Sequence, residues 1–270
     1  MIDKEDLKYD MQPCCDIETK KARSGNGIDV RRVIEKLDSF FDKNDLASAG
    51  RLLEYWRGEA ALIGDKRGEL SMVSEQIGYF RKTAEMEKAL EAVERAVTLI
   101  GELKNERTVS AATVYLNAAT TLKAFGKSAQ AMPLYEKAYN IYKEELNEDD
   151  PRFGGFYNNV GLALVDIGET EKAEMAYKAA ISVMLKKENG KAEAAITYVN
   201  LAHLYEGIER DNDVKSALET ARVLLNDRDI PRNGYYAFVL SKCAPSYRYF
   251  GFTEEAERME RQVKEIYEGT

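Results

Sequence analysis

The chain has 270 residues, and 39 Lys and Arg residues against 47 Asp and Glu residues give it a net charge of -8. This acidic balance disfavours nonspecific binding to nucleic acid, whose phosphates attract cations. Apolar residues make up 44% of the chain, which is enough to build a core and excludes a disordered protein. The apolar runs are short, as at residues 60–63 and 237–240, so no segment of the about 20 residues needed to span a membrane is expected.

Residues 1–27 are predicted to form a flexible leader. Their charged start lacks the apolar stretch of a secretory signal, so we expect a cytoplasmic protein. Cys14 and Cys15 are adjacent, but nothing nearby completes a zinc site, since the one histidine is His203. We therefore expect neither a metal nor another cofactor.

From residue 28 onward, the chain repeats itself with a period of about 42 residues. Gly126 matches Gly168, and Tyr135 matches Tyr177, each pair being 42 residues apart. Apolar residues recur at spacings of three and four on both sides of each glycine, which predicts two helices per unit. One helix pair cannot bury both of its apolar stripes, so neighbouring pairs must stack.

Six such units are expected to form a single solenoid. The first is the least similar to the others, as is usual for a terminal repeat, and its core candidates include Leu37, Leu53 and Trp56. In the fifth unit, a turn about three residues longer is expected before Ala217. The predicted units span residues 28–69, 70–111, 112–153, 154–194, 195–236 and 237–270.

The pattern of these units resembles the tetratricopeptide repeat, with an aromatic residue and a glycine in the first half, then alanine, an aromatic residue and alanine. In the third unit these positions are Tyr115, Gly126, Ala131, Tyr135 and Ala138. The long period resembles the kinesin-light-chain type of repeat, as do the runs AQAMPLY at 129–135, DDP at 149–151 and NNVGLA at 158–163. The resemblance implies an all-α, right-handed superhelical solenoid of antiparallel helix pairs.

The same resemblance implies that the first helices of the units line a concave groove that binds a protein or peptide. Asn117, Asn159 and Asn200 stand at one equivalent position of three consecutive first helices. Asparagine is a mediocre helix former, but its amide both donates and accepts hydrogen bonds. A ladder of asparagines could therefore hold the backbone of an extended peptide. Alternatively, these residues only bond between neighbouring helices and shape the solenoid.

Further groove candidates are mostly cationic or amide side chains. The cations would make the groove less acidic than the chain as a whole, which favours an acidic ligand segment; alternatively, they only solvate a polar surface. Pro245, inside the first helix of the sixth unit, is expected to kink it. These candidates are Asn158, Lys123, His203, Arg81, Lys242 and Arg248.

No catalytic group of residues is recognisable, and the chain is expected not to be an enzyme. One histidine excludes most His-dependent sites, and the Gly-rich run at 23–27 lacks the features of a phosphate-binding loop. Three functions stay open: an adaptor that binds an extended peptide, a peptide-responsive regulator of a separate effector, and a self-associating scaffold. The oligomeric state is open as well. In one hypothesis the leader lies in the groove as a built-in blocker.

Overall fold

The computed structural model describes residues 27–268, and within this range the chain forms α-helices as its only regular elements. The predicted leader, with Cys14 and Cys15, lies almost entirely outside the described residues. The helices are α1 (Val30–Asp42), α2 (Leu46–Leu62), α3 (Lys66–Lys82), α4 (Met86–Glu102), α5 (Val109–Ala124), α6 (Ser128–Glu145), α7 (Arg152–Asp166), α8 (Thr170–Lys186), α9 (Lys191–Glu206), α10 (Asp211–Leu225), α11 (Gly234–Tyr249) and α12 (Thr253–Glu268).

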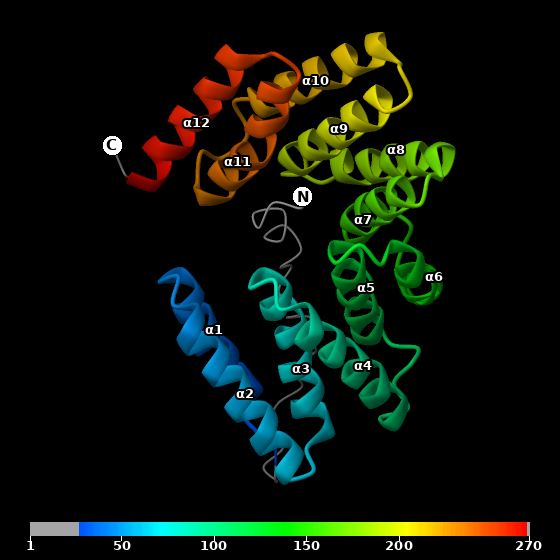
Figure 1. Cartoon of the computed structure of the whole chain (residues 1–270), viewed down its shortest axis with the longest axis vertical. Coiled ribbons are helices and arrows are strands. Elements are labelled where there is room, and N and C mark those ends of the chain that lie inside the picture. Colours follow the sequence, from blue (N-terminus) through cyan, green and yellow to red (C-terminus); the bar gives the residue numbers. More distant parts are fainter. Residues whose placement is uncertain (1–26, 269–270) are drawn as a thin grey trace. The chain divides into compact units, whose positions relative to one another are not determined.

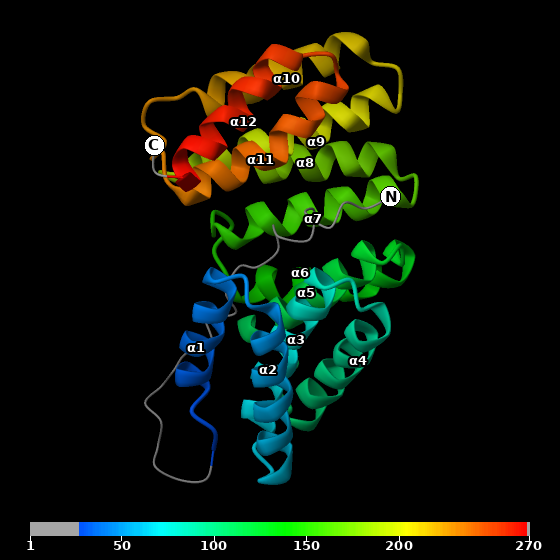
Figure 2. The same ribbon diagram turned by 60° about the vertical axis from the view of Figure 1, so that its left-hand side comes forward.

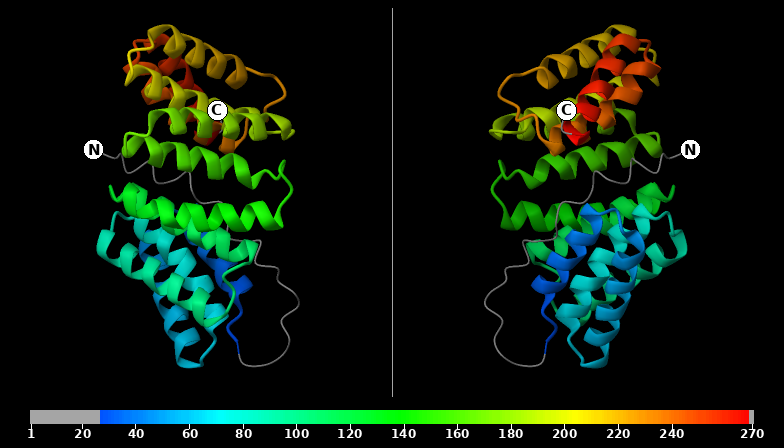
Figure 3. Two further views of the ribbon diagram at one scale, coloured as in Figure 1. Left: turned by 90° about the vertical axis from the view of Figure 1, so that its right-hand side faces the viewer. Right: turned by 90° about the vertical axis from the view of Figure 1, so that its left-hand side faces the viewer.

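Consecutive helices pack in antiparallel pairs, and the predicted all-α repeat fold is confirmed (Figure 1). Two compact units are present: unit 1 ends at Glu145 and unit 2 begins at Leu146. We call the first helix of each pair the A helix (α1, α3, α5, α7, α9, α11) and the second the B helix. Figures 2 and 3 show the same pairs from other sides. The division of the chain into one solenoid of six repeats stays a prediction.

Every A helix ends in the same kind of turn. In the third and fourth pairs, Gly126 and Gly168 have φ of 72° and 79°, in the left-handed region that glycine enters without a steric penalty. The N–H of Gly168 bonds to the carbonyl of Val165, and the N–H of Glu169 to that of Leu164. The left-handed residues of these six turns are Asn44, Ala84, Gly126, Gly168, Glu209 and Gly251.

The fifth turn corrects a sequence expectation, because it is not longer by three residues. Its left-handed residue is Glu209, and the N–H of Arg210 bonds to the Tyr205 carbonyl as in the other turns. Counting from this turn, Val214 rather than Ala217 opens the buried face of the B helix. At the start of the six B helices, the amides that bond to the carbonyl four residues earlier, in the turn, belong to Ala49, Ala89, Ala131, Ala173, Val214 and Ala256.

The core of each unit follows the stripes expected from the sequence. In unit 1, Leu37 and Leu53 are buried, and Trp56 packs at the edge of their cluster. In unit 2, Gly161 lies directly against the ring of Tyr177, and a Cβ at this glycine would stand 2.6 Å from Cε1 of that ring. A helix-to-helix approach this close requires glycine at position 161.

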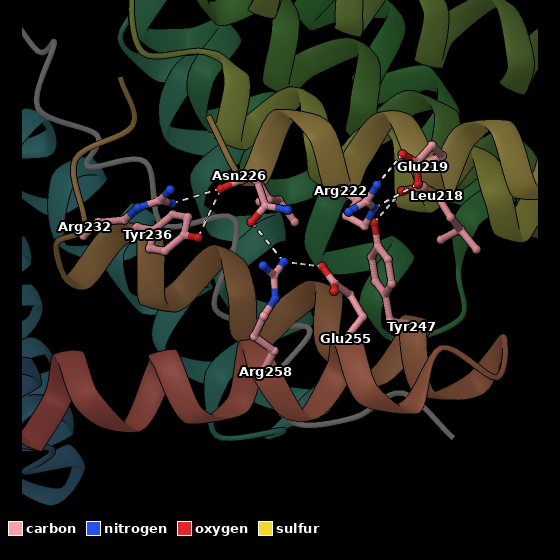
Figure 4. Close-up of polar contacts among 10 residues, drawn as sticks. Leu218, Glu219, Arg222, Asn226, Arg232, Tyr236, Tyr247, Glu255 and Arg258 are labelled. Carbon is pink, nitrogen blue, oxygen red and sulfur yellow. Dashed lines mark hydrogen bonds and ion pairs between the residues drawn. The ribbon is translucent and has the colours of Figure 1, made fainter. Parts of the chain in front are cut away.

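Buried tyrosines of α11 fasten it to α10 (Figure 4). The Tyr247 hydroxyl donates to the Leu218 carbonyl at 2.5 Å, and the Tyr236 hydroxyl donates to the Leu225 carbonyl at 3.1 Å. The Arg258 guanidinium on α12 donates to Asn226 at 2.9 Å. The bond from Tyr236 satisfies the carbonyl of Leu225 at the end of α10, and the three bonds together hold the last helix pair on it.

None of the helices within residues 27–268 is long and apolar enough to cross a membrane. Helix α7 begins directly after the run DDP at residues 149–151. Pro151 has helical dihedral angles, and the Asp150 carboxylate accepts from the N–H of Arg152 at 3.0 Å. Helix α11 continues through Pro245.

Candidate functional site

The A helices of unit 2 lie side by side, because α9 packs against both α7 and α11. They bring together the asparagines predicted on α7 and α9. Asn158 is 1% exposed, and its Oδ1 accepts from Asn200 Nδ2 at 2.9 Å and from Thr197 Oγ1 at 3.1 Å. Asn200 therefore does bond between neighbouring helices, as the structural alternative required, but its partner is Asn158 rather than Asn159.

Asn159 lies beside this network without joining it. Its side chain is 8% exposed and makes no hydrogen bond to any side chain or backbone group among residues 27–268. The Nδ2 of Asn158 is also without a hydrogen-bond partner in this part of the chain. Two neighbouring asparagines on α7 thus retain hydrogen-bonding capacity that the described protein does not use.

Asn117 occupies the equivalent position on α5 in unit 1. Its side chain is partly buried, and it has no hydrogen-bond partner among the residues that the structure describes. At the same position of the preceding repeat stands Glu75. Burial and the nearby Asp38 carboxylate raise the pKa of Glu75 to about 7, because both disfavour its charged form.

His203 joins α9 to α11 at the surface of unit 2. Its Nε2 shares a hydrogen bond of 2.8 Å with Ser246 Oγ, and its ring centroid lies 4.8 Å from that of Phe250. The hydroxyl of the exposed Tyr249 donates to Glu206 Oε1 at 2.9 Å, and this acceptor raises the pKa of Tyr249. The histidine is therefore already held by its neighbours, although it is exposed.

Arg81 does not line an open surface in unit 1, and this corrects the expectation for it. It is 1% exposed, and its Nη1 donates to Thr121 Oγ1 at 3.1 Å. Its Nε has no hydrogen-bond partner among the described residues. Helix α3 packs against α1, α2, α4 and α5, and this central position encloses the side chain. Lys123, at the equivalent place on α5, is partly buried.

The cations of α11 have partners as well. Arg248 pairs with Glu260 on α12, its Nη2 lying 2.9 and 2.7 Å from the two carboxylate oxygens. This pairing draws it toward the B helix of its own pair, but the side chain stays exposed, and its place on the ligand-binding stripe stays a prediction. The Lys242 ammonium lies 5.8 Å from the centre of the Phe238 ring on the same helix.

Sequence reasoning missed Thr197, which is fully buried and completes the Asn158 network. Thr197 lies on the apolar stripe of its helix, and a buried hydroxyl needs a hydrogen-bond partner. The sequence therefore could have indicated that Thr197 bonds to a polar group on a neighbouring helix. Sequence reasoning also missed Ser246 as the partner of His203. No group of three His, Cys, Asp or Glu side chains within residues 27–268 could hold a metal ion.

Comparison with known families and structures agrees with the architecture. Residues 75–144 match one tetratricopeptide repeat model and residues 155–183 match another. No curated protein matches the chain.

Three of the solved structures that are similar to the chain illustrate the likeness. BtubC (BKLC) from P. vanneervenii shares 20% identity over 72% of this chain and 79% of that chain, with a TM-score of 0.65. A putative kinesin light chain from Podosopora anserina with nearly identical repeats shares 16% identity over 73% and 94%, with a TM-score of 0.55. The apo form of RapI shares 14% identity over 89% and 98%, with a TM-score of 0.63. At these identities, the likeness concerns the fold.

Proposed function

We propose that this chain, which is a tetratricopeptide repeat protein resembling the kinesin-light-chain type and hence a protein–protein interaction module, binds an extended peptide along its A helices. In this proposal it acts in the cytoplasm by binding, not by catalysis. One observation carries the proposal: Asn159 has an amide that no described residue engages, although the side chain is largely buried on a helix.

An amide in this position suits a peptide backbone. It can donate to a carbonyl and accept from an N–H at the same time, so it holds a main chain of any sequence. The amide atoms of Asn159 are not among the fully buried polar atoms without a partner, so a ligand can reach them. Asn200 donates through Nδ2 to Asn158, and its Oδ1 accepts no hydrogen bond from the described residues, so it would contribute an acceptor.

The proposal is tested with a 12-residue peptide selected against the full chain from a random library. We expect Asn159→Ala to weaken its binding about tenfold, the effect of losing one or two hydrogen bonds worth about 1 kcal/mol each. Asn212→Ala is the matched control, because it removes the same amide from the exposed face of a B helix, α10. Affinity is measured by isothermal titration calorimetry.

Circular dichroism on the same variants separates binding from folding. We expect the helical content and melting midpoint of Asn159→Ala to match those of the parent chain. Unchanged peptide affinity in Asn159→Ala would overturn the proposal. A collapsed melting midpoint would assign the asparagine to the structural role instead.

A further inference from the structure

A second surface of unit 2 is formed by the three turns that connect its A and B helices. We call it the turn edge of unit 2, comprising residues 165–169, 206–210 and 248–252. The residue directly before the left-handed position is apolar in all three turns: Ile167, Ile208 and Phe250. Because they occupy equivalent positions of stacked repeats, the three are expected to form a row along this edge.

The turn itself does not require an apolar residue at this place. In unit 1 the same backbone turn, closed by the same two hydrogen bonds, carries Lys43 and Thr83 there. Only Phe125, in the third turn of unit 1, is apolar at this position. Formation of the turn therefore does not explain the row in unit 2.

Two of the three side chains are open to water, whereas Phe250 is partly buried and its ring centroid lies 4.8 Å from that of His203. Ile167 is 38% exposed and Ile208 is 37% exposed. Val165, Tyr249 and Phe252, which flank the row in the same turns, are exposed as well. Single exposed apolar residues are ordinary on a surface, but a concentration of them in one place marks an interaction site.

The charged side chains beside the row that lack an ion pair are all acidic. The cations nearby are already paired: Lys172 with Glu169, Arg210 with Glu174 and Asp213, and Arg248 with Glu260. Three exposed acids in or just after these turns, Glu171, Glu209 and Asp211, have no ion pair among residues 27–268. The turn edge is thus an apolar row with an acidic margin.

We propose that the turn edge of unit 2 docks a basic amphipathic helix of a partner protein. Neighbouring helices pack about 8–10 Å apart, so the row advances by about that distance per repeat. An α-helix rises about 10.5 Å over seven residues, so apolar residues at i, i+7 and i+14 meet successive turns. Lys and Arg beside them would face the unpaired acids. The acidic margin disfavours an anionic membrane as the occupant.

The test uses two 18-residue peptides with leucines at i, i+3, i+7, i+11 and i+14. The remaining positions are mainly Lys in one peptide and Glu in the other. We expect the full chain to bind the Lys peptide at least tenfold more tightly than the Glu peptide, measured by fluorescence anisotropy. The double variant Ile167→Asp/Ile208→Asp should lose at least tenfold in affinity for the Lys peptide.

Two controls locate the binding. Met175→Asp places the same charge on α8 at a side chain that is 71% exposed, and it should leave the affinity unchanged. Asn159→Ala should also leave it unchanged, which separates this surface from the proposed peptide site. If the double variant is misfolded by circular dichroism, Glu209→Lys replaces it and should weaken the Lys peptide while strengthening the Glu peptide. Equal affinity of the parent, double variant and Glu209→Lys for the Lys peptide would overturn the proposal.

Discussion

The two compact units bury different kinds of polar group. The charged side chains that are buried in the described residues, Glu69 and Arg81, both belong to unit 1. Glu69 is bound by Arg95 through two bonds of 2.7 Å between α3 and α4. In unit 2 the corresponding role falls to neutral groups, with Asn158 and Thr197 joining α7 to α9.

This difference shows that one helix-pair architecture tolerates two ways of joining its helices. Charged groups are costly to bury and depend on their partner and on pH, whereas neutral amides and hydroxyls need only a hydrogen bond. We therefore expect the stability of unit 1 to respond more to charge and pH than that of unit 2. Unit 1 also contains Trp56, the chain's one tryptophan, whose fluorescence reports on this unit.

The largest effect is expected in unit 2, from packing and not from charge. Gly161→Ala would force a Cβ into the Tyr177 ring, and we expect a loss of about 2–3 kcal/mol of stability. Gly78→Ala on α3 is the matched control, since no atom lies within 4 Å of a Cβ there and removing a helical glycine should stabilise by about 0.5–1 kcal/mol. Urea unfolding followed by circular dichroism measures both. Equal losses in the two variants would contradict the close approach at Gly161.

A somewhat smaller loss is expected when the buried ion pair of unit 1 is broken. Arg95→Ala leaves the Glu69 carboxylate buried without its partner. Because Arg95 is itself partly open to water, we expect about 2 kcal/mol rather than the larger loss of a fully buried pair. Urea unfolding followed by Trp56 fluorescence measures it. Arg222→Ala, which breaks the exposed pair with Glu219 in unit 2, should leave the circular dichroism curve unchanged.

The pH dependence of unit 1 is expected to come from Glu75. Its pKa in the folded protein is about 7, above the 4.5 of an ordinary glutamate. Between these values the folded form holds more protons than the unfolded form, so stability falls as the pH rises from about 4.5 to 7. In Glu75→Gln, the loss of unfolding free energy over this pH range should be smaller by about 1–2 kcal/mol. Trp56-monitored melts at pH 5 and pH 8 check it, and an equal fall in the variant would exclude Glu75 as the cause.

The smallest change in stability is expected at the turns between A and B helices, which have the same geometry in both units. Gly168→Ala places a Cβ in the left-handed conformation and should destabilise by about 1 kcal/mol. Ala84→Gly relieves the same strain in unit 1 and should stabilise by a similar amount. Thermal melts measure the pair of changes. The same sign in both variants would argue against a common turn geometry.

The sequence predicted the helices and the common turn well, because local spacing and glycine determine both. It placed the fifth turn wrongly because matching by residue type favoured Ala217, whereas the backbone puts Val214 at that position. The left-handed position of this turn is occupied by Glu209 rather than glycine, so the glycine that marks the turn in the neighbouring repeats was absent from the sequence.

The candidate site was less predictable than the fold. The equivalent asparagines were found by their spacing. The pairing of Asn200 with Asn158 depends on how closely α7 and α9 approach each other, and the spacing of residues along the chain does not reveal this approach. The same holds for Arg81, whose burial follows from the central place of α3 in unit 1. Long-range packing therefore decides which predicted cations and amides are available to a ligand.

The connection between α10 and α11 has a consequence for proteolysis. Residues 226–233 form the longest link between two helices in residues 27–268, yet Arg232 donates to the carbonyls of Leu225 and Asp227, and Ile230 is buried. Lys191 adds an ion pair to Asp227 at 2.6 Å. A protease must draw a segment out into an extended strand before it can cut. Trypsin in limited digestion should therefore spare Arg228 and Arg232, although both lie in the link that length alone would mark as the most vulnerable.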